Sequence, residues 1–108
     1  MKKFITLVLL ILTLSVTSQI QVVQFNANWN SANGVDWLNK LSDCKINQVD
    51  IAVDKAAQTK YKIIVVPTIV VFNNGEEIKR FQANIMMQME TKLEDIQNLV
   101  DETIMESF

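Results

Sequence analysis

Residues 22–29 read VVQFNANW, and this stretch decides the fold prediction. It belongs to a short β-branched run that starts at Ile20 and predicts a buried strand over residues 20–25. After Trp29 come the small and polar residues NSAN at 30–33, which favour turns and helix starts. The stretch therefore predicts a buried strand that leads directly into a polar turn.

The residues that follow alternate between helical and strand-like patterns. Apolar residues at helical spacing predict a helix over residues 35–41, and residues 46–53 return to strand character. Asp54 can accept a hydrogen bond from a first-turn N–H, so we expect it to cap a short helix that runs to Tyr61.

The C-terminal half predicts a hairpin and then a helix. Residues 68–72 and 77–81 form two strand-like runs around Asn73-Asn74-Gly75, and Asn-Gly favours a tight hairpin turn because both residues tolerate positive φ. Apolar residues then recur in steps of three and four, which predicts an amphipathic helix against the sheet, at Met89, Leu93, Ile96, Val100 and Ile104.

No linker, repeat or low-complexity tract divides the chain, so we expect a single α/β unit. The first two strands are joined by a helical crossover and the last two by a tight turn. The sheet is therefore predicted to be mixed.

Four segments of the sequence resemble the thioredoxin family in the same register: residues 22–29, 49–51, 66–68 and 72–76. The resemblance covers nearly all of residues 20–105. It implies an α/β thioredoxin-like fold, with a central mixed four-stranded sheet flanked by helices. The N-terminal strand and helix of a full thioredoxin are missing from this pattern.

The resemblance also implies where a redox site would lie. In the family the tryptophan is followed by Cys-Gly-Pro-Cys at a helix start, where the first thiol ionises readily. Here Trp29 is followed by Asn30, Ser31, Ala32 and Asn33. An asparagine amide cannot attack a disulfide, so we expect no dithiol oxidoreductase activity and no catalytic residue in this turn.

Gln24 is a second departure from the family pattern that also indicates a loss of redox function. It stands where relatives carry a buried aspartate that helps to deprotonate the second thiol. A buried glutamine would hydrogen-bond without ionising, which fits a loss of redox function. The alternative is an ordinary residue at the strand edge or facing solvent.

The polar turn itself has two interpretations. Asn30, Ser31 and Asn33 can form a hydrogen-bonding cluster, or they can serve as ordinary N-cap residues. Trp29 and Trp37 can offer an exposed aromatic surface, although we expect at least one to pack partly into the core.

Val66-Pro67-Thr68 is the strongest family feature that the chain retains. In relatives this proline follows a cis peptide bond opposite the active-site turn, and the backbone before it pairs with an extended substrate. The resemblance therefore predicts a cis-proline groove in which Trp29, Val66, Pro67 and Thr68 bind a polypeptide. The other interpretation of Pro67 is purely structural, at the start of a strand.

The N-terminus is typical of a signal peptide. Lys2-Lys3 precede an apolar run from Phe4 to Leu14, and small residues before Gln19 suit a cleavage site. We expect residues 1–18 to be removed and residues 19–108 to form the domain, exported to a periplasm, a secretory lumen or the outside of the cell. The run falls short of the roughly 20 residues that a membrane span needs, but an uncleaved membrane tether is the alternative.

Charge and cysteine content exclude several classes of protein. Without Lys2 and Lys3, the chain has 8 basic and 12 acidic residues, so its net charge moves from −2 to −4 and nucleic acid is not an expected partner. With one cysteine and no histidine, the chain cannot form an internal disulfide, a Cys/His zinc site or an iron–sulfur site. We expect no metal and no cofactor.

The sequence thus predicts an exported, redox-inactive thioredoxin-like protein that binds a protein or an extended polypeptide, or is a subunit of a larger assembly. The alternative is a divergent thiol–disulfide factor that uses Cys44 as a monothiol. Lys45 beside Cys44 gives that alternative modest support, whereas a half-buried structural thiol is the competing interpretation.

Overall fold

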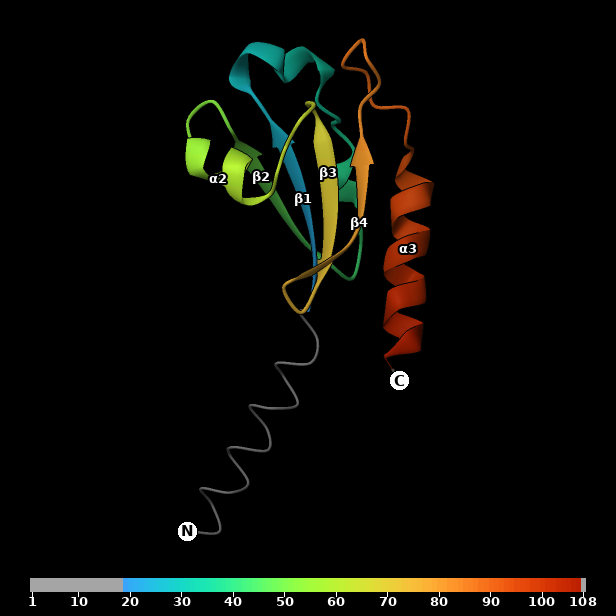
Figure 1. Cartoon of the computed structure of the whole chain (residues 1–108). Helices are drawn as coiled ribbons and strands as arrows, with labels where there is room; N and C mark the ends of the chain where they lie inside the picture. The colour runs from blue at the N-terminus through green and yellow to red at the C-terminus, as the bar shows by residue number, and fades with distance from the viewer. Residues whose placement is uncertain (1–18, 108) are drawn as a thin grey trace, which may run out of the picture.

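The computed structural model describes residues 19–107. The predicted signal peptide, residues 1–18, lies outside the described residues. The chain forms strands and helices in the order β1, β2, α2, β3, β4 and α3, with two 3₁₀ segments between β1 and β2 (Figure 1). No helix among the described residues has the length and apolar character needed to cross a membrane.

The sheet has four strands in the order β2-β1-β3-β4. β1 (Ile20–Asn26) pairs parallel with β2 (Lys45–Asp50) and antiparallel with β3 (Thr68–Asn73). β4 (Glu76–Gln82) pairs antiparallel with β3. The predicted mixed sheet is therefore confirmed.

The hairpin between β3 and β4 forms as the Asn-Gly signal predicts. Asn74 and Gly75 have φ values of 55° and 83°. Positive φ at both positions matches the right-handed twist of the two strands, so the turn can be tight.

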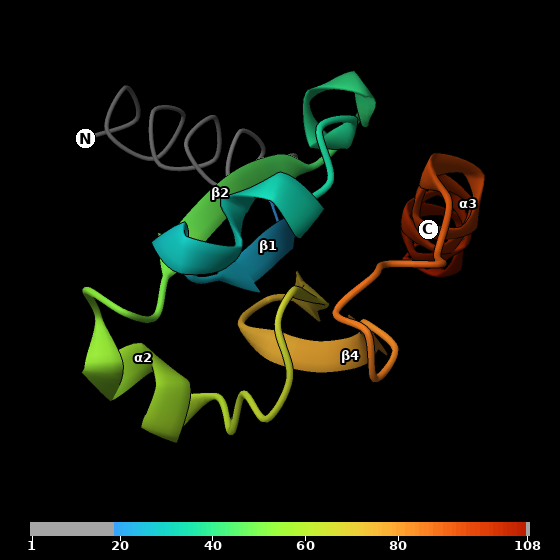
Figure 2. The same ribbon diagram turned by 90° about the horizontal axis from the view of Figure 1, so that it is seen from above.

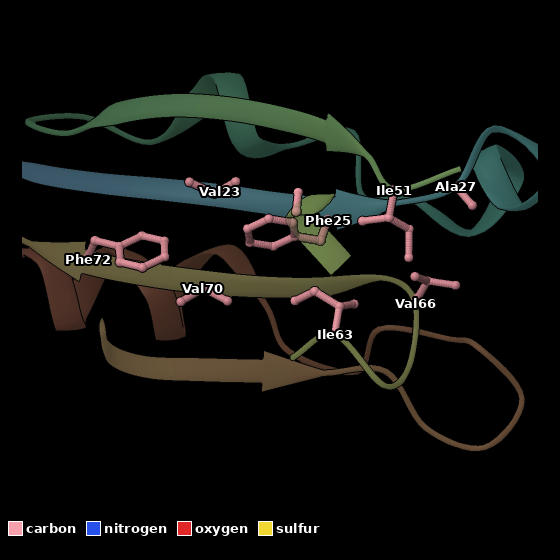
Figure 3. Packing of buried hydrophobic residues seen from close by; sticks show 9 residues of the cluster. Val23, Phe25, Ala27, Ile51, Ile63, Val66, Val70 and Phe72 are labelled. Carbon is pink, nitrogen blue, oxygen red and sulfur yellow. The ribbon is translucent and has the colours of Figure 1, made fainter. Parts of the chain in front are cut away.

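The central strands are buried on both faces, which explains their continuous apolar runs. One core cluster joins the sheet to α2 (Lys55–Lys60), and Figure 3 shows Val23 and Phe25 of β1 facing Val70 and Phe72 of β3 in it. The other cluster joins the opposite face to α3 (Leu93–Glu106) through Ile96 and Val100. Figure 2, seen from above, shows α2 and α3 on different sides of the sheet.

The short helix α2 starts as predicted. The Asp54 carboxylate accepts a hydrogen bond of 3.1 Å from the Ala57 N–H, which caps the first turn. The preceding strand ends at Asp50 and not at Val53, because the Asp50 carbonyl accepts from the Val53 and Asp54 N–H groups and turns the chain away from the sheet.

The predicted helix over residues 35–41 is wrong. The chain forms two 3₁₀ segments, Asn28–Asn33 and Leu38–Lys40, with extended backbone at Gly34 between them. The Lys40 and Leu41 N–H groups each donate at 3.0 Å to a carbonyl three residues back, at Trp37 and Leu38, so the segment forms a 3₁₀ turn and not an α-helix. The Val35 N–H donates to the Gln24 side chain at 2.9 Å, which anchors the chain before this turn. Leu38 and Leu41 are nevertheless buried, as their spacing suggests.

The C-terminal helix begins later than its apolar pattern suggests. Met89 lies before the helix, although it still packs partly buried against the α3 core cluster. The Lys92 N–H donates to the Asp95 carboxylate at 3.0 Å, as in a capping box. Lys92 is therefore the cap residue, and α3 begins at Leu93.

Candidate functional site

The candidate site lies at one end of the sheet, where β1 ends and β3 begins. Phe25 near the end of β1 is paired with Thr68 at the start of β3. The Asn28–Asn33 turn follows β1, and the loop that ends at Pro67 leads into β3. Figure 1 shows both at the top of the molecule, with the loop after β4 beside them.

Asn30 is the buried centre of the polar turn, with 5% of its surface exposed. Its amide NH₂ donates to the Asn26 side chain at 3.1 Å and to the Val66 carbonyl at 3.3 Å. Its side-chain oxygen accepts from the Asn33 amide at 2.8 Å. Both amide N–H groups and the carbonyl oxygen of Asn30 are thus used within the protein.

The cluster interpretation is therefore correct for Asn30 and Asn33 but not for Ser31, and the N-cap interpretation is wrong. Ala27 occupies the cap position of the 3₁₀ segment, and no side chain caps it. Ser31, Ala32 and Asn33 are exposed. The structure brings Asn30 and Asn33 together, whereas Ser31 and Ala32 make no side-chain hydrogen bond among the described residues.

Gln24 lies in the protein interior, with 3% of its surface exposed, so the edge or solvent-facing alternative is wrong. Its side-chain oxygen accepts the Val35 N–H and holds the chain as it leaves the turn. A neutral amide thus occupies a buried position beside the turn. No residue in 26–35 or 63–69 is titratable, so neither segment offers an acid or base for proton transfer.

The Val66–Pro67 peptide bond is cis. Val66, Pro67 and Thr68 are buried, and the Thr68 hydroxyl donates to the Val65 carbonyl at 2.6 Å. The Val66 carbonyl accepts from Asn30. The Val66 N–H has no hydrogen-bond acceptor within residues 19–107. The backbone that the sequence predicts to be free for a ligand is thus engaged by Asn30 at its carbonyl.

Arg80 on β4 holds the loop before Val66 in place. Its guanidinium donates to the Tyr61 and Lys62 carbonyls at 2.8 and 3.1 Å and forms a forked pair with Glu77. The hydrogen bond from Arg80 lowers the pKa of the Glu77 carboxyl, and the attraction between the two charges adds to this. The loop is therefore tied to β4 by Arg80 as well as to the turn by Asn30.

Sequence reasoning missed the loop after β4. The Ala83 N–H donates to the Pro67 carbonyl at 3.0 Å, so this loop is joined to the candidate site. The Asn84 side chain then accepts from the Met86 and Gln88 N–H groups at 2.9 and 3.0 Å. This ordered loop presents Ile85, which is 100% exposed, beside the exposed Met86 and Met87. The signal in the sequence is the run Ile85-Met86-Met87, which breaks the helical spacing.

The two tryptophans lie in different environments. Trp29 is 66% exposed at the polar turn, while Trp37 packs partly buried against the α3 core cluster. We call Trp29, the backbone of Val66 and the residues Ile85–Met87 the end surface. Its parts are linked by the hydrogen bonds from Asn30 to Val66 and from Ala83 to Pro67.

Cys44 lies at the opposite end of the sheet. It precedes β2, whose first residue pairs with Gln21, whereas Trp29 follows the far end of β1. The intervening strand spans about 3.3 Å per residue, so the thiol is distant from the polar turn. Burial raises the pKa of the Cys44 thiol, and the nearby Asp43 and Asp101 carboxylates raise it further. These features oppose the monothiol alternative, because a raised pKa leaves less thiolate.

Comparison with solved structures identifies the fold. A thioredoxin from Halobacterium salinarum (N21Q mutant) aligns with a TM-score of 0.59 and 19% identity, over 79% of this chain and 74% of that one. Schistosoma mansoni thioredoxin aligns with a TM-score of 0.57 and 19% identity, over 80% and 78% of the two chains. The chain has a thioredoxin-like fold.

The predicted fold class is thereby confirmed. Fasciola hepatica thioredoxin gives a TM-score of 0.54 at 25% identity and covers 91% of this thioredoxin-like chain and 89% of its own. No family model and no curated protein matches the sequence. With a single cysteine, the thioredoxin-like chain has no Cys-x-x-Cys motif.

Proposed function

We propose that this chain is an exported thioredoxin-like protein without dithiol redox activity, which binds an extended polypeptide through the end surface, alone or as a subunit of a larger assembly. The observation that carries the proposal is Asn30. Its buried amide occupies the turn where the family has its first thiol, and its side chain bonds to Asn26, Asn33 and the Val66 carbonyl, so it joins the turn to the Val66 loop.

The composition of the end surface supports a polypeptide partner. Residues 26–35, 63–69 and 81–89 contain no charged side chain, although the chain has 22 charged residues in total, 10 basic and 12 acidic. Protein interfaces are depleted of charge at their centres and enriched in tryptophan and methionine. Trp29, Met86 and Met87 fit that pattern, and methionine side chains adapt to different apolar partners.

The backbone supports an extended partner. The Val66 N–H has no acceptor among the described residues, whereas the buried Val66 carbonyl already accepts from Asn30. An extended chain could therefore accept a hydrogen bond from the Val66 N–H, as an added strand does. The side chains of Trp29 and Ile85 would supply apolar contact on either side.

Affinity isolation from the native source, with mass spectrometry of the retained proteins, tests the binding role. Trp29→Ala should lose the partner that the wild-type chain retains. Val53→Ala is the matched control, because Val53 is 77% exposed and lies outside the end surface. Equal retention by Trp29→Ala and wild type would overturn the assignment of the surface. Loss of the partner from Val53→Ala as well would indicate nonspecific apolar capture.

Export is tested by the mass of the protein as it accumulates in its source. The proposal expects Gln19 at the N-terminus, with residues 1–18 removed. A mass that includes residues 1–18 would contradict cleavage and favour the membrane tether.

A further inference from the structure

β2 is an edge strand of the sheet. It pairs with β1 on one side, and no described residue pairs with its other side. The centre of β2, residues 46–49, carries no charge, proline or bulge. Natural edge strands are usually protected by such features, because an unpaired edge is a template for another strand. Lys45 and Asp50 place one charge of each sign at the two ends of this edge.

The direction of the backbone groups on β2 follows from one hydrogen bond. The Ile51 N–H donates to the Asn26 carbonyl at 2.9 Å and therefore points toward β1. Because successive residues of a strand point to opposite sides, Ile46, Gln48 and Asp50 direct their N–H and C=O groups to the free edge. The Asp50 carbonyl already accepts from Val53 and Asp54, but both groups of Ile46 and Gln48 are open.

The sheet face beside this edge is also incompletely covered. A cavity of about 260 Å³ opens there, lined by side chains of β1 and β2 and by Tyr61 and Phe72. The helix α2, which packs on this face, has only six residues. The open edge and the open face are contiguous, because Asn47, Gln48 and Val49 line the cavity.

We propose that two copies of this chain pair through β2 as antiparallel strands, with Gln48 on the twofold axis, so that the two sheets join into one. In this register Gln48 faces Gln48 of the second copy, and Ile46 faces Asp50 of the second copy. These are the residues with outward backbone groups, so the Gln48 pair can exchange two hydrogen bonds. Each Ile46 carbonyl can accept from the Asp50 N–H of the second copy, since the Asp50 carbonyl is already used within its own chain. A twofold axis perpendicular to the sheet keeps the two cavity faces on the same side.

Charge favours a second copy as the occupant. The antiparallel arrangement places Lys45 of one copy at the end where the other copy has Asp50, and it keeps like charges at opposite ends of the pair. A parallel arrangement would place like charges together. The dimer leaves both end surfaces free and directs them to opposite ends of the joined sheet, so it does not depend on the proposed binding role.

The test measures molar mass by light scattering and sedimentation over a concentration series, on the protein in the form in which it accumulates. Gln48→Lys places two cations beside each other at the twofold axis, and Gln48→Thr is the neutral control at the same exposed position. We expect a dimer for the wild type and for Gln48→Thr, and a several-fold weaker dimer for Gln48→Lys at low salt.

Cross-linking tests the register. In a Cys44→Ser background, oxidised Gln48→Cys should form a covalent dimer, because residue 48 faces itself across the axis. Gln58→Cys, on the exposed face of α2, should not. A wild-type monomer at every concentration would overturn the proposal, as would a dimer that Gln48→Lys leaves unchanged. Cross-linking by both cysteine variants alike would overturn the register.

Discussion

Asn30→Ala tests whether the amide cluster holds the polar turn against the Val66 loop. The substitution removes the donors to Asn26 and Val66 and the acceptor for Asn33. The Val66 carbonyl is buried, so losing its partner costs about 1–3 kcal/mol. Asn33 is exposed and Asn26 is half-buried, so water can partly replace the hydrogen bonds that these two side chains lose. The loss of each of these bonds therefore lowers the free energy of unfolding by at most about 0.5 kcal/mol.

We therefore expect Asn30→Ala to lower the free energy of unfolding by about 1–4 kcal/mol. Asn33→Ala removes only one partly exposed hydrogen bond and should cost about 0.5 kcal/mol. Asn28 is exposed, so Asn28→Ala should change the free energy of unfolding by less than about 0.5 kcal/mol. All three variants make the same Asn→Ala change, so the differences among them report chiefly the hydrogen bonds that each side chain makes.

Urea unfolding of the wild type and the three variants, followed by far-ultraviolet circular dichroism, gives the free energies and their denaturant slopes. An unchanged slope would show that the variants unfold from the same compact state. If Asn30→Ala unfolds at the same urea concentration as Asn28→Ala, the cluster does not hold the turn and the reasoning about Asn30 is refuted.

Three further predictions concern thiol chemistry. The mature protein should not reduce insulin disulfides; turnover above a buffer control that survives Cys44→Ser would contradict this. Asn30→Cys with Asn33→Cys should form a disulfide, because the two side chains already meet at 2.8 Å, while insulin reduction by this variant should stay slow as long as Gln24 replaces the acid. Activity equal to that of an ordinary thioredoxin would refute the role given to Gln24. Cys44 should react with iodoacetamide more slowly than free cysteine at neutral pH, because burial and two nearby carboxylates raise the pKa of its thiol. Its reaction rate should reach half of the maximum at a higher pH than that of free cysteine. A half-maximal rate at the same or a lower pH than for free cysteine would contradict this.

The strands and the hairpin were predictable because their signals are local. β-branched runs and the Asn74-Gly75 pair specify strand and turn within a few residues. The helix expected over 35–41 is replaced by a 3₁₀ turn, because Lys40 and Leu41 donate three residues back. The chain before this turn is anchored by the bond from the Val35 N–H to Gln24, which is 11 positions away. Apolar spacing places Leu38 and Leu41 in the core but does not report which backbone groups are already bonded.

The candidate site was predictable only in part for the same reason. The spacing of Asn30, Ser31 and Asn33 permits both a cluster and a set of caps, and the cluster depends on a contact between Asn30 and Val66, 36 positions away. The loop at Ile85–Met87 was missed because its exposure depends on the turn that Asn84 builds and on the late start of α3. A periodic pattern that includes Met89 gives no sign of that turn.

The physical demands of a thiol and of an amide explain why the turn can persist without its redox function. A nucleophilic cysteine needs access to solvent and an environment that favours its thiolate. Asparagine does not titrate and is stable in the interior only when its donors and acceptor are paired. Asn30 meets that requirement by bonding to the Val66 carbonyl, which is the group that a ligand would otherwise use. Binding at this end would then depend on the Val66 N–H and on the apolar side chains of Trp29 and Ile85, and partners should be selected by contact and not by disulfide exchange.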